Sequence, residues 1–155
     1  MGNIWQEGEY SISDDPARLD LGSIHEFLTN SYWAAGISFE VMKRSIENSL
    51  SLGVYAGARQ VGFARVVTDY ATFAYIGDVF ILESHRGRGL SKKLMRAIMS
   101  HPRLQGLRRW HLSTRDAHGL YRQYGFTGLK TPDRHMEKWD PDIYRVAKTG
   151  ARSLT

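Results

Sequence analysis

The 155-residue chain is 42% hydrophobic and 24% charged, which predicts an ordinary globular domain with one core. It has no cysteine, so a disulfide scaffold, a thiolate zinc site and a cysteine nucleophile are excluded. The net charge of +5 is uneven: residues 1–83 carry 11 acidic and 5 basic side chains, whereas residues 84–130 carry 1 acidic and 11 basic ones. This basic block favours a polyanionic partner, either nucleic acid or a multiply phosphorylated small molecule.

The N-terminal half predicts an edge strand over residues 4–13, then helices over 21–33 and 38–50. In the second helix apolar residues recur at three- and four-residue spacing, and Ser38 is a suitable N-cap. Two strands joined by a hairpin follow, and then a third strand; we place these three strands over residues 52–56, 61–67 and 73–82.

The C-terminal half predicts a helix from Leu90 that ends at His101-Pro102. A strand over 108–114, a short helix over 116–124, and a loop with a final strand over 126–139 follow. The order β-α-α-β-β-β-α-β-α-β predicts an α/β fold whose sheet is antiparallel early and gains one parallel pair. We expect one domain over residues 1–145 and a flexible tail over 146–155. No signal pattern and no membrane-spanning apolar run is found, which predicts a cytoplasmic protein without a membrane partner.

A basic turn with two glycines, Gly87 and Gly89, joins the third of these strands to the helix at Leu90. Glycines let a backbone approach a ligand closely, and the N–H groups of a first helical turn point at an anion, so this turn predicts a phosphate seat. Neither of the two common nucleotide-binding loops, the dinucleotide fingerprint and the Walker A loop, matches this turn. A dinucleotide fingerprint needs glycine where Lys92 stands, and the Walker A pattern occurs nowhere in the chain.

The turn resembles motif A of the GNAT superfamily of acyl-CoA-dependent acetyltransferases, Q/R-x-x-G-x-G/A, and reads Arg86-Gly87-Arg88-Gly89-Leu90-Ser91. Ser91 departs from the pattern, which has glycine or alanine there. One strand later, residues 117–126 are similar to motif B, A-x-x-L-Y-x-x-x-G-F. The resemblance implies a mixed, mostly antiparallel central sheet flanked by helices, with a V-shaped opening between the central strands.

By the same resemblance, the V-shaped opening holds acetyl-CoA. One strand edge pairs with the pantetheine arm, and the N–H groups of residues 87–92 hold the pyrophosphate. Basic side chains, Lys93 among them, add charge for the phosphates. The implied cofactor-binding residues are Val79, Phe80, Ile81, Arg86, Gly87, Arg88, Gly89, Leu90, Ser91, Lys92 and Tyr121.

Tyr121 matches the family tyrosine that lies beside the sulfur of the thioester and protonates it. The N–H group of Phe80 or Ile81, where the family strand carries a bulge, is the expected oxyanion donor. Asp78 is a candidate general base acting through water, or else a carboxylate with a structural partner. Tyr32 and Trp33, in the connection between the first two helices, are expected to line the acceptor pocket or to cover the core.

Other titratable residues carry less weight. Glu83, His111 and His118 are expected to be solvated or structural, and no histidine or carboxylate cluster has metal-ligand spacing, so no metal is predicted. The resemblance therefore implies an N-acetyltransferase that transfers an acetyl group from acetyl-CoA to a primary amine by direct attack.

Two other classes of function stay open. One is a non-catalytic CoA-binding sensor, which needs no acid at Tyr121. The other is a nucleic-acid-binding module that uses the basic surface with Trp110, Tyr121 and Tyr124, although the two ordered motifs argue against nucleic acid as the partner. The identity of the amine is open, and a homodimer is compatible with the resemblance.

Overall fold

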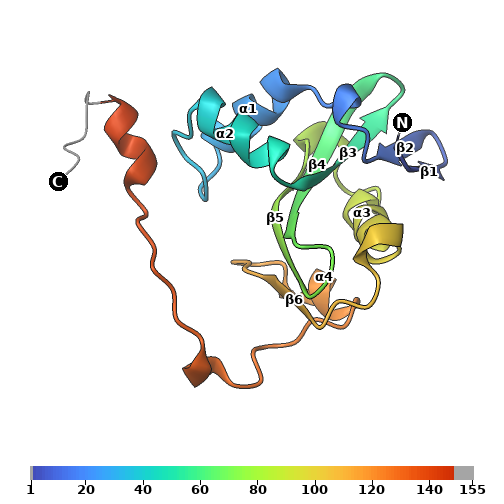
Figure 1. Cartoon of the computed structure of the whole chain (residues 1–155). Coiled ribbons are helices and arrows are strands. Elements are labelled where there is room, and N and C mark those ends of the chain that lie inside the picture. Colours follow the sequence, from blue (N-terminus) through green and yellow to red (C-terminus); the bar gives the residue numbers. More distant parts are fainter. Residues whose placement is uncertain (1, 149–155) are drawn as a thin grey trace.

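The computed structural model describes residues 2–148 and contains one six-stranded sheet whose strands lie in chain order (Figure 1). Neighbouring strands are antiparallel from β1 to β5, and β6 pairs parallel to β5. The predicted mostly antiparallel α/β fold is therefore confirmed. The strands are β1 (Ile4–Glu7), β2 (Tyr10–Ser13), β3 (Leu50–Ala56), β4 (Arg59–Thr68), β5 (Phe73–Ile81) and β6 (Arg109–Leu112).

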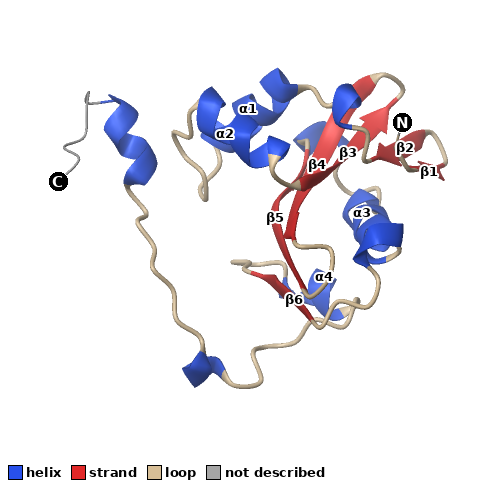
Figure 2. Cartoon of the chain, viewed as in Figure 1, coloured by secondary structure: helices blue, strands red, loops and turns tan. Residues whose placement is uncertain are grey.

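Helices flank the sheet on both faces (Figure 2). None of the helices within residues 2–148 is long and apolar enough to cross a bilayer. The α-helices are α1 (Leu21–Thr29), α2 (Phe39–Glu47), α3 (Leu90–Met99) and α4 (His118–Arg122). Short 3-10 helices are formed by Pro16–Arg18, Glu83–His85, Pro102–Leu104, Pro132–Arg134 and Ile143–Lys148.

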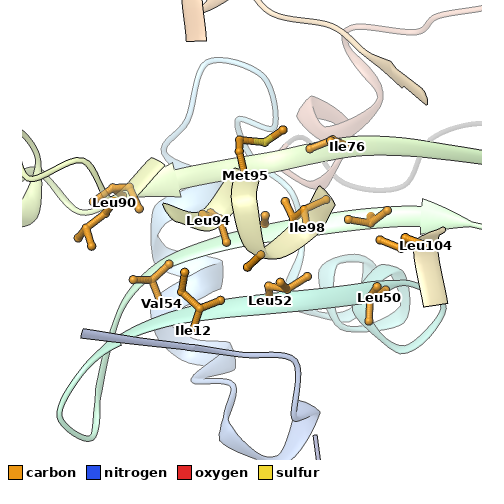
Figure 3. Packing of buried hydrophobic residues seen from close by; sticks show 14 of the residues in the cluster. Ile12, Leu50, Leu52, Val54, Ile76, Leu90, Leu94, Met95, Ile98 and Leu104 are labelled. Atoms are coloured by element: carbon orange, nitrogen blue, oxygen red, sulfur yellow. The ribbon is translucent and has the colours of Figure 1, made fainter. Parts of the chain in front are cut away.

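The larger hydrophobic core lies between the sheet and α3 (Figure 3). Alternate residues of a strand point to one face, so Leu50, Leu52 and Val54 of β3 all face this core. Residues spaced along one side of α3, such as Leu94 and Ile98, meet them and are fully buried. This packing fixes the start of α3, and with it the glycine turn, against the end of β5.

A second core lies on the opposite face, where α1 and α2 cover Phe63 of β4 and Phe80 of β5. Helix α2 begins as predicted, because the Ser38 hydroxyl accepts a hydrogen bond of 3.2 Å from the Val41 N–H group. Helix α1 ends four residues earlier than predicted. Asn30 ends it by donating from its side chain to the Glu26 carbonyl (2.8 Å), which releases residues 30–38 as a loop.

A β-bulge interrupts β5 at Asp78. Phe63 pairs with Phe80 and Arg65 pairs with Gly77, so Asp78 and its neighbour stand together opposite one residue of β4. Asp78 has a φ of 55°, in the left-handed region. The extra residue reverses the facing of the strand: Ile76 lies in the core under α3, whereas Phe80, four residues on, lies in the core under α1 and α2.

Strands β5 and β6 separate beyond this point. Their parallel pairing runs from Phe73 opposite Arg109 to Ile76 opposite Leu112 and then stops. Residues 77–81 continue to pair with β4 but have no strand partner on their other side within the described part of the chain. This is the predicted V-shaped opening between the central strands, and it leaves one edge of β5 available to a ligand.

Two predicted strands are corrected. The single edge strand over residues 4–13 is a hairpin of β1 and β2, because Gly8 turns the chain with a φ of 65°. The final strand within 126–139 does not form: no strand follows β6 in the described residues, and Pro132 starts a 3-10 helix instead. Of the predicted tail, residues 146–148 belong to a 3-10 helix and 149–155 lie outside the described residues. The domain boundary at residue 145 stays a prediction.

Candidate active site

The glycine turn and the first turn of α3 form a concave surface. Gly87 and Gly89 have φ values of 79° and 74°, in the left-handed region that glycine adopts without a steric cost. Gly89 is the N-cap residue of α3 and offers no side-chain cap. The backbone N–H groups of residues 87–92 donate to no acceptor within the described part of the chain. Six unpaired donors are thus left around one turn.

These donors border a hollow of about 280 Å³. Ile81, the last residue of β5, lines one side of it, whereas the predicted cofactor-binding residues Val79, Phe80 and Tyr121 do not line it. Most of the residues predicted to bind phosphate line it, with Ser91 among them, while Arg88 does not. The lining residues are Ile81, His85, Arg86, Gly87, Gly89, Leu90, Ser91, Lys92 and Leu120.

Two of the predicted cationic residues brace the turn. Arg86 donates from Nε to the Ile81 carbonyl at 2.9 Å, which ties the turn to the end of β5. Arg88 donates from Nη1 to the Tyr10 hydroxyl at 2.9 Å and lies 3.6 Å from a carboxylate oxygen of Glu9. The Tyr10 hydroxyl is in turn 2.9 Å from Nδ1 of His85. No local sequence signal predicts this support from β2, because the contact joins residues 78 positions apart.

Tyr121 lies in α4 with 8% of its surface exposed. Burial raises the pKa of its phenol, and the nearby phenol of Tyr32 raises it further. Tyr32 comes from the loop between α1 and α2, and the Arg115 guanidinium lies 3.9 Å above the centre of its ring. The fold therefore brings Tyr121 together with one of the residues predicted for the acceptor pocket, although 89 positions separate them.

Asp78 forms a hydrogen bond with Trp33, the other residue predicted to line the acceptor pocket. Its Oδ1 accepts a hydrogen bond of 2.9 Å from the indole N–H of Trp33. Its Oδ2 forms a 2.8 Å ion pair with Nε of Arg65, and both side chains are largely buried. Arg65 also donates to the Ser49 hydroxyl at 3.0 Å. Arg65 is a functional candidate not predicted above, although a lone charge within the buried run of β4 is a recognisable signal.

Within the described part of the chain, Glu83, His111 and His118 form no hydrogen bond or ion pair with this network, although His111 contacts Tyr75, which lies near Asp78. His111 of β6 stacks between Tyr75 and His135 at centroid distances of 5.8 and 6.1 Å. Glu83 and His118 are exposed. Within residues 2–148 no group of histidines and carboxylates could hold a metal ion.

His101, considered only as the end of a helix, is fully buried. Its Nε2 lies 2.6 Å from Oδ2 of Asp14, and its Nδ1 accepts a 3.1 Å hydrogen bond from the Arg103 N–H group. Burial, the largest single effect, acts to raise the pKa of Asp14. The bonds from Asn3 and His101 outweigh it, so the pKa lies below its usual value. The pair fastens the end of β2 to the end of α3.

Comparisons with known proteins identify the family. Residues 47–128 match the family model described as an acetyltransferase (GNAT) domain. A crystal structure from Xanthomonas campestris pv. campestris, described as a candidate acetyltransferase of the GNAT family, is 52% identical; it covers 87% of this chain and 96% of its own, with a TM-score of 0.86. A candidate acetyltransferase of Gibberella zeae is 29% identical over 140 residues, 76% of this chain and 78% of that protein.

A more distant structure shares the fold alone. It is a candidate acetyltransferase with acetyl-CoA from Clostridium acetobutylicum, with a TM-score of 0.59 at 16% identity, covering 84% of this chain and 92% of its own. Together, the fold and the comparisons define an acyltransferase enzyme. The chain belongs to the GNAT acetyltransferase family.

Proposed function

We propose that this enzyme transfers an acetyl group from acetyl-CoA to a primary amine by direct attack of the amine on the thioester. The observation that carries the proposal is the run of unpaired N–H groups over residues 87–92, directly beside the open edge of β5. Donors in this arrangement suit a pyrophosphate, and an open strand edge suits the amides of a pantetheine arm. The fold relative from Clostridium acetobutylicum, described with acetyl-CoA, supports the same donor.

In this proposal, the turn and the strand edge position the donor. The N–H groups of residues 87–92 hold the pyrophosphate, and Lys92 adds a positive charge at the rim of the hollow. Beyond the bulge at Asp78, the N–H group of Ile81 donates to the oxygen of the thioester as negative charge develops there. The Phe80 N–H points to β4, like that of Leu82, which donates to the Val61 carbonyl. Such a donor contributes roughly 3 kcal/mol in other acyl-transfer enzymes.

Tyr121 is the proposed acid. Because burial raises the pKa of its phenol, the hydroxyl keeps its proton at neutral pH. The amine nitrogen bonds to the carbonyl carbon to give a tetrahedral intermediate with the negative charge on oxygen. This intermediate collapses as the carbon–sulfur bond breaks and the sulfur takes the proton of Tyr121. The amine gives up one proton to a base, which leaves an amide and free CoA. A thiol pKa of about 8.5 makes the sulfur a fair leaving group even without the acid.

Asp78 is the proposed base, acting through a water molecule. Each carboxylate oxygen already accepts one hydrogen bond, from Trp33 or from Arg65, and keeps a further lone pair for water. The alternative role is positioning: Asp78 would only hold Trp33 at the acceptor loop. Asp78→Asn separates the two, because loss of the base lowers kcat, whereas a displaced Trp33 raises KM for the amine.

Calorimetric titration with acetyl-CoA, followed by an assay of CoA release on a panel of amines, tests the proposal. A thiol reagent detects free CoA without background from the protein, because the chain has no cysteine. Absence of acetyl-CoA binding would overturn the proposed donor. Binding without turnover on any amine would favour a non-catalytic CoA sensor, and tight, salt-sensitive binding of nucleic acid in place of acetyl-CoA would favour a nucleic-acid-binding module.

A further inference from the structure

A row of aromatic side chains, which we call the aromatic wall, extends from the core under α1 and α2 into the loop between these helices. It begins where Phe27 stacks on Phe80, with ring centroids 3.9 Å apart. The ring centroid of Trp33 lies 6.1 Å from that of Phe27, and the centroid of Tyr32 lies 5.1 Å from that of Trp33. Tyr32 and Trp33 are 57% and 41% exposed, so this part of the wall can contact a ligand with an apolar body.

The aromatic wall passes the groups proposed for the reaction. The indole N–H of Trp33 donates to Oδ1 of Asp78, the proposed base. The phenol of Tyr32 lies near that of Tyr121, the proposed acid. A molecule that lies against Tyr32 and Trp33 therefore has one part beside the reacting groups.

Arg115, in the loop between β6 and α4, stands at the Tyr32 end of the aromatic wall. Its guanidinium carbon lies 3.9 Å above the centre of the Tyr32 ring. The loop itself is held by a hydrogen bond of 3.1 Å from the Ala117 N–H group to the Thr114 hydroxyl. Arg115 is thus positioned both by its own loop and by the loop between α1 and α2.

The guanidinium of Arg115 keeps donors for a ligand. Stacking uses the face of the group, so the N–H groups in its plane stay available for a carboxylate. Within residues 2–148 its side chain makes one other polar contact, in which Nη2 lies 4.0 Å from Oδ2 of Asp116, and both side chains are largely exposed. Such an ion pair contributes little. Asp78, by contrast, is already held by Arg65 at 2.8 Å.

We propose that the acceptor is an amine that carries its own carboxylate, and that Arg115 binds this carboxylate. Tyr32 and Trp33 contact the flat, apolar body of the acceptor, and its amine lies beside Tyr121. The centre of the Tyr32 ring lies 5.1 Å from that of Trp33 and 3.9 Å from the Arg115 guanidinium carbon, a span that an amino carboxylate built on one ring can bridge. This inference rests on the proposed function, because it names the acceptor class of the same reaction.

Matched pairs of acceptors test the role of the carboxylate. In an assay of CoA release, ortho-, meta- and para-(aminomethyl)benzoate are each compared with the corresponding neutral benzamide. Within a pair the amine and the ring are the same and the charge differs, while the series varies the distance between amine and carboxylate. At least one benzoate should have a kcat/KM about 10- to 100-fold above that of its amide, because a bidentate pair between arginine and carboxylate is a strong interaction.

Three variants locate the source of this preference. Arg115→Ala should raise KM for the preferred benzoate and remove the preference, while kcat/KM for the amide stays unchanged. Arg115→Lys keeps the charge but lacks the planar fork, so it should keep only part of the preference. Arg122→Ala is the matched control: Arg122 is an exposed arginine of α4, so this variant removes the same charge from the same region and should keep the full preference.

A ligand without an amine tests the carboxylate site apart from the reaction. para-Methylbenzoate cannot accept an acetyl group, but it has the same ring and carboxylate as the preferred acceptors. It should shift the NMR signal of the Trp33 indole N–H in the wild type, and Arg115→Ala should lose this shift. Trp33→Phe assigns the signal among the four tryptophans of the chain.

These measurements separate the acceptor class from the reaction. If the amides are acetylated as well as the benzoates, or if the preference survives in Arg115→Ala, the inference is wrong and the proposed reaction stands. If no amine is acetylated but para-methylbenzoate shifts the Trp33 signal only when Arg115 is present, the carboxylate site stands and the proposed reaction is wrong. An equal loss of preference in Arg122→Ala would assign it to long-range charge and overturn the role of Arg115. Absence of both acetylation and the Trp33 shift would overturn both proposals.

Discussion

Replacing Gly89 with alanine should weaken acetyl-CoA binding while changing the stability of the fold very little. Gly89 has a φ of 74°, and a Cβ atom added there would meet nothing within 4 Å. The cost is therefore conformational, because an L-residue pays about 1–2 kcal/mol in the left-handed region. The exposed turn can avoid this cost in the free protein by leaving that region, but its N–H groups then no longer converge on one anion.

The affinity change follows from that strain. If binding must restore the left-handed turn, the 1–2 kcal/mol appears in the dissociation constant, and 1.4 kcal/mol corresponds to tenfold. We therefore expect acetyl-CoA to bind Gly89→Ala about 5- to 30-fold more weakly. If the turn does not relax, the strain instead lowers the free energy of unfolding by the same 1–2 kcal/mol. The loss in binding free energy and the loss in stability should therefore add up to about 1–2 kcal/mol.

Gly57→Ala provides the matched control. Gly57 has a φ of 60°, and an added Cβ atom again meets nothing within 4 Å, but it lies in the hairpin turn between β3 and β4, where Ala56 pairs with Arg59. This tight turn cannot relax without breaking strand pairs, so Gly57→Ala should lose about 1–2 kcal/mol of stability in urea unfolding and bind acetyl-CoA normally. Wild-type affinity in Gly89→Ala with full stability, or equal weakening in both variants, would refute the reasoning.

Three further outcomes follow from the hydroxyl and carboxyl groups. Tyr121→Phe should lower kcat by about 10- to 100-fold. This loss is no larger than the usual contribution of a general acid, because a thiolate is a good leaving group. The affinity for acetyl-CoA, measured by calorimetry, should stay unchanged. The lowered pKa of Asp14 stabilises the fold above the unfolded value of 3.8, and this contribution is lost as pH falls through the folded pKa, so Asp14→Asn should lose less stability than wild type between pH 7 and pH 3 in urea unfolding. Tyr55→Phe should raise the free energy of unfolding by about 1 kcal/mol, because this buried hydroxyl, whose pKa is raised to about 12 by burial, has no hydrogen-bond partner within residues 2–148.

Each of these expectations can fail in a distinct way. An unchanged kcat in Tyr121→Phe would remove the phenol from the reaction. Equal losses for Asp14→Asn and wild type at pH 3 would mean that the bonds to Asn3 and His101 do not govern the acid response. A lower urea midpoint for Tyr55→Phe would show that the hydroxyl does find a partner in solution.

Local signals predicted most of the fold. The N-cap at Ser38, the apolar spacing of α3 and the glycines of the turn act within one or two turns of chain, so the printed letters carry them directly. The final strand predicted over residues 126–139 was wrong, because a local pattern alone is not sufficient to form a strand. A strand-like pattern reports the preference of a segment to pair, but it does not say which edge will pair with it, and here no edge within residues 2–148 does.

The contacts around Asp78 could not be read in the same way, because they depend on the bulge. Asp78 and Ile76 are two residues apart, so a regular strand would put both on one face. The bulge turns Asp78 to the side of α1 and α2, where Trp33 and Arg65 bind its two oxygens. One inserted residue thus leaves the edge of β5 unpaired and fastens beside it the loop between α1 and α2, the proposed acceptor loop. For that reason a change at Asp78 should disturb donor and acceptor sides together, whereas a change at Gly89 should disturb only the donor side.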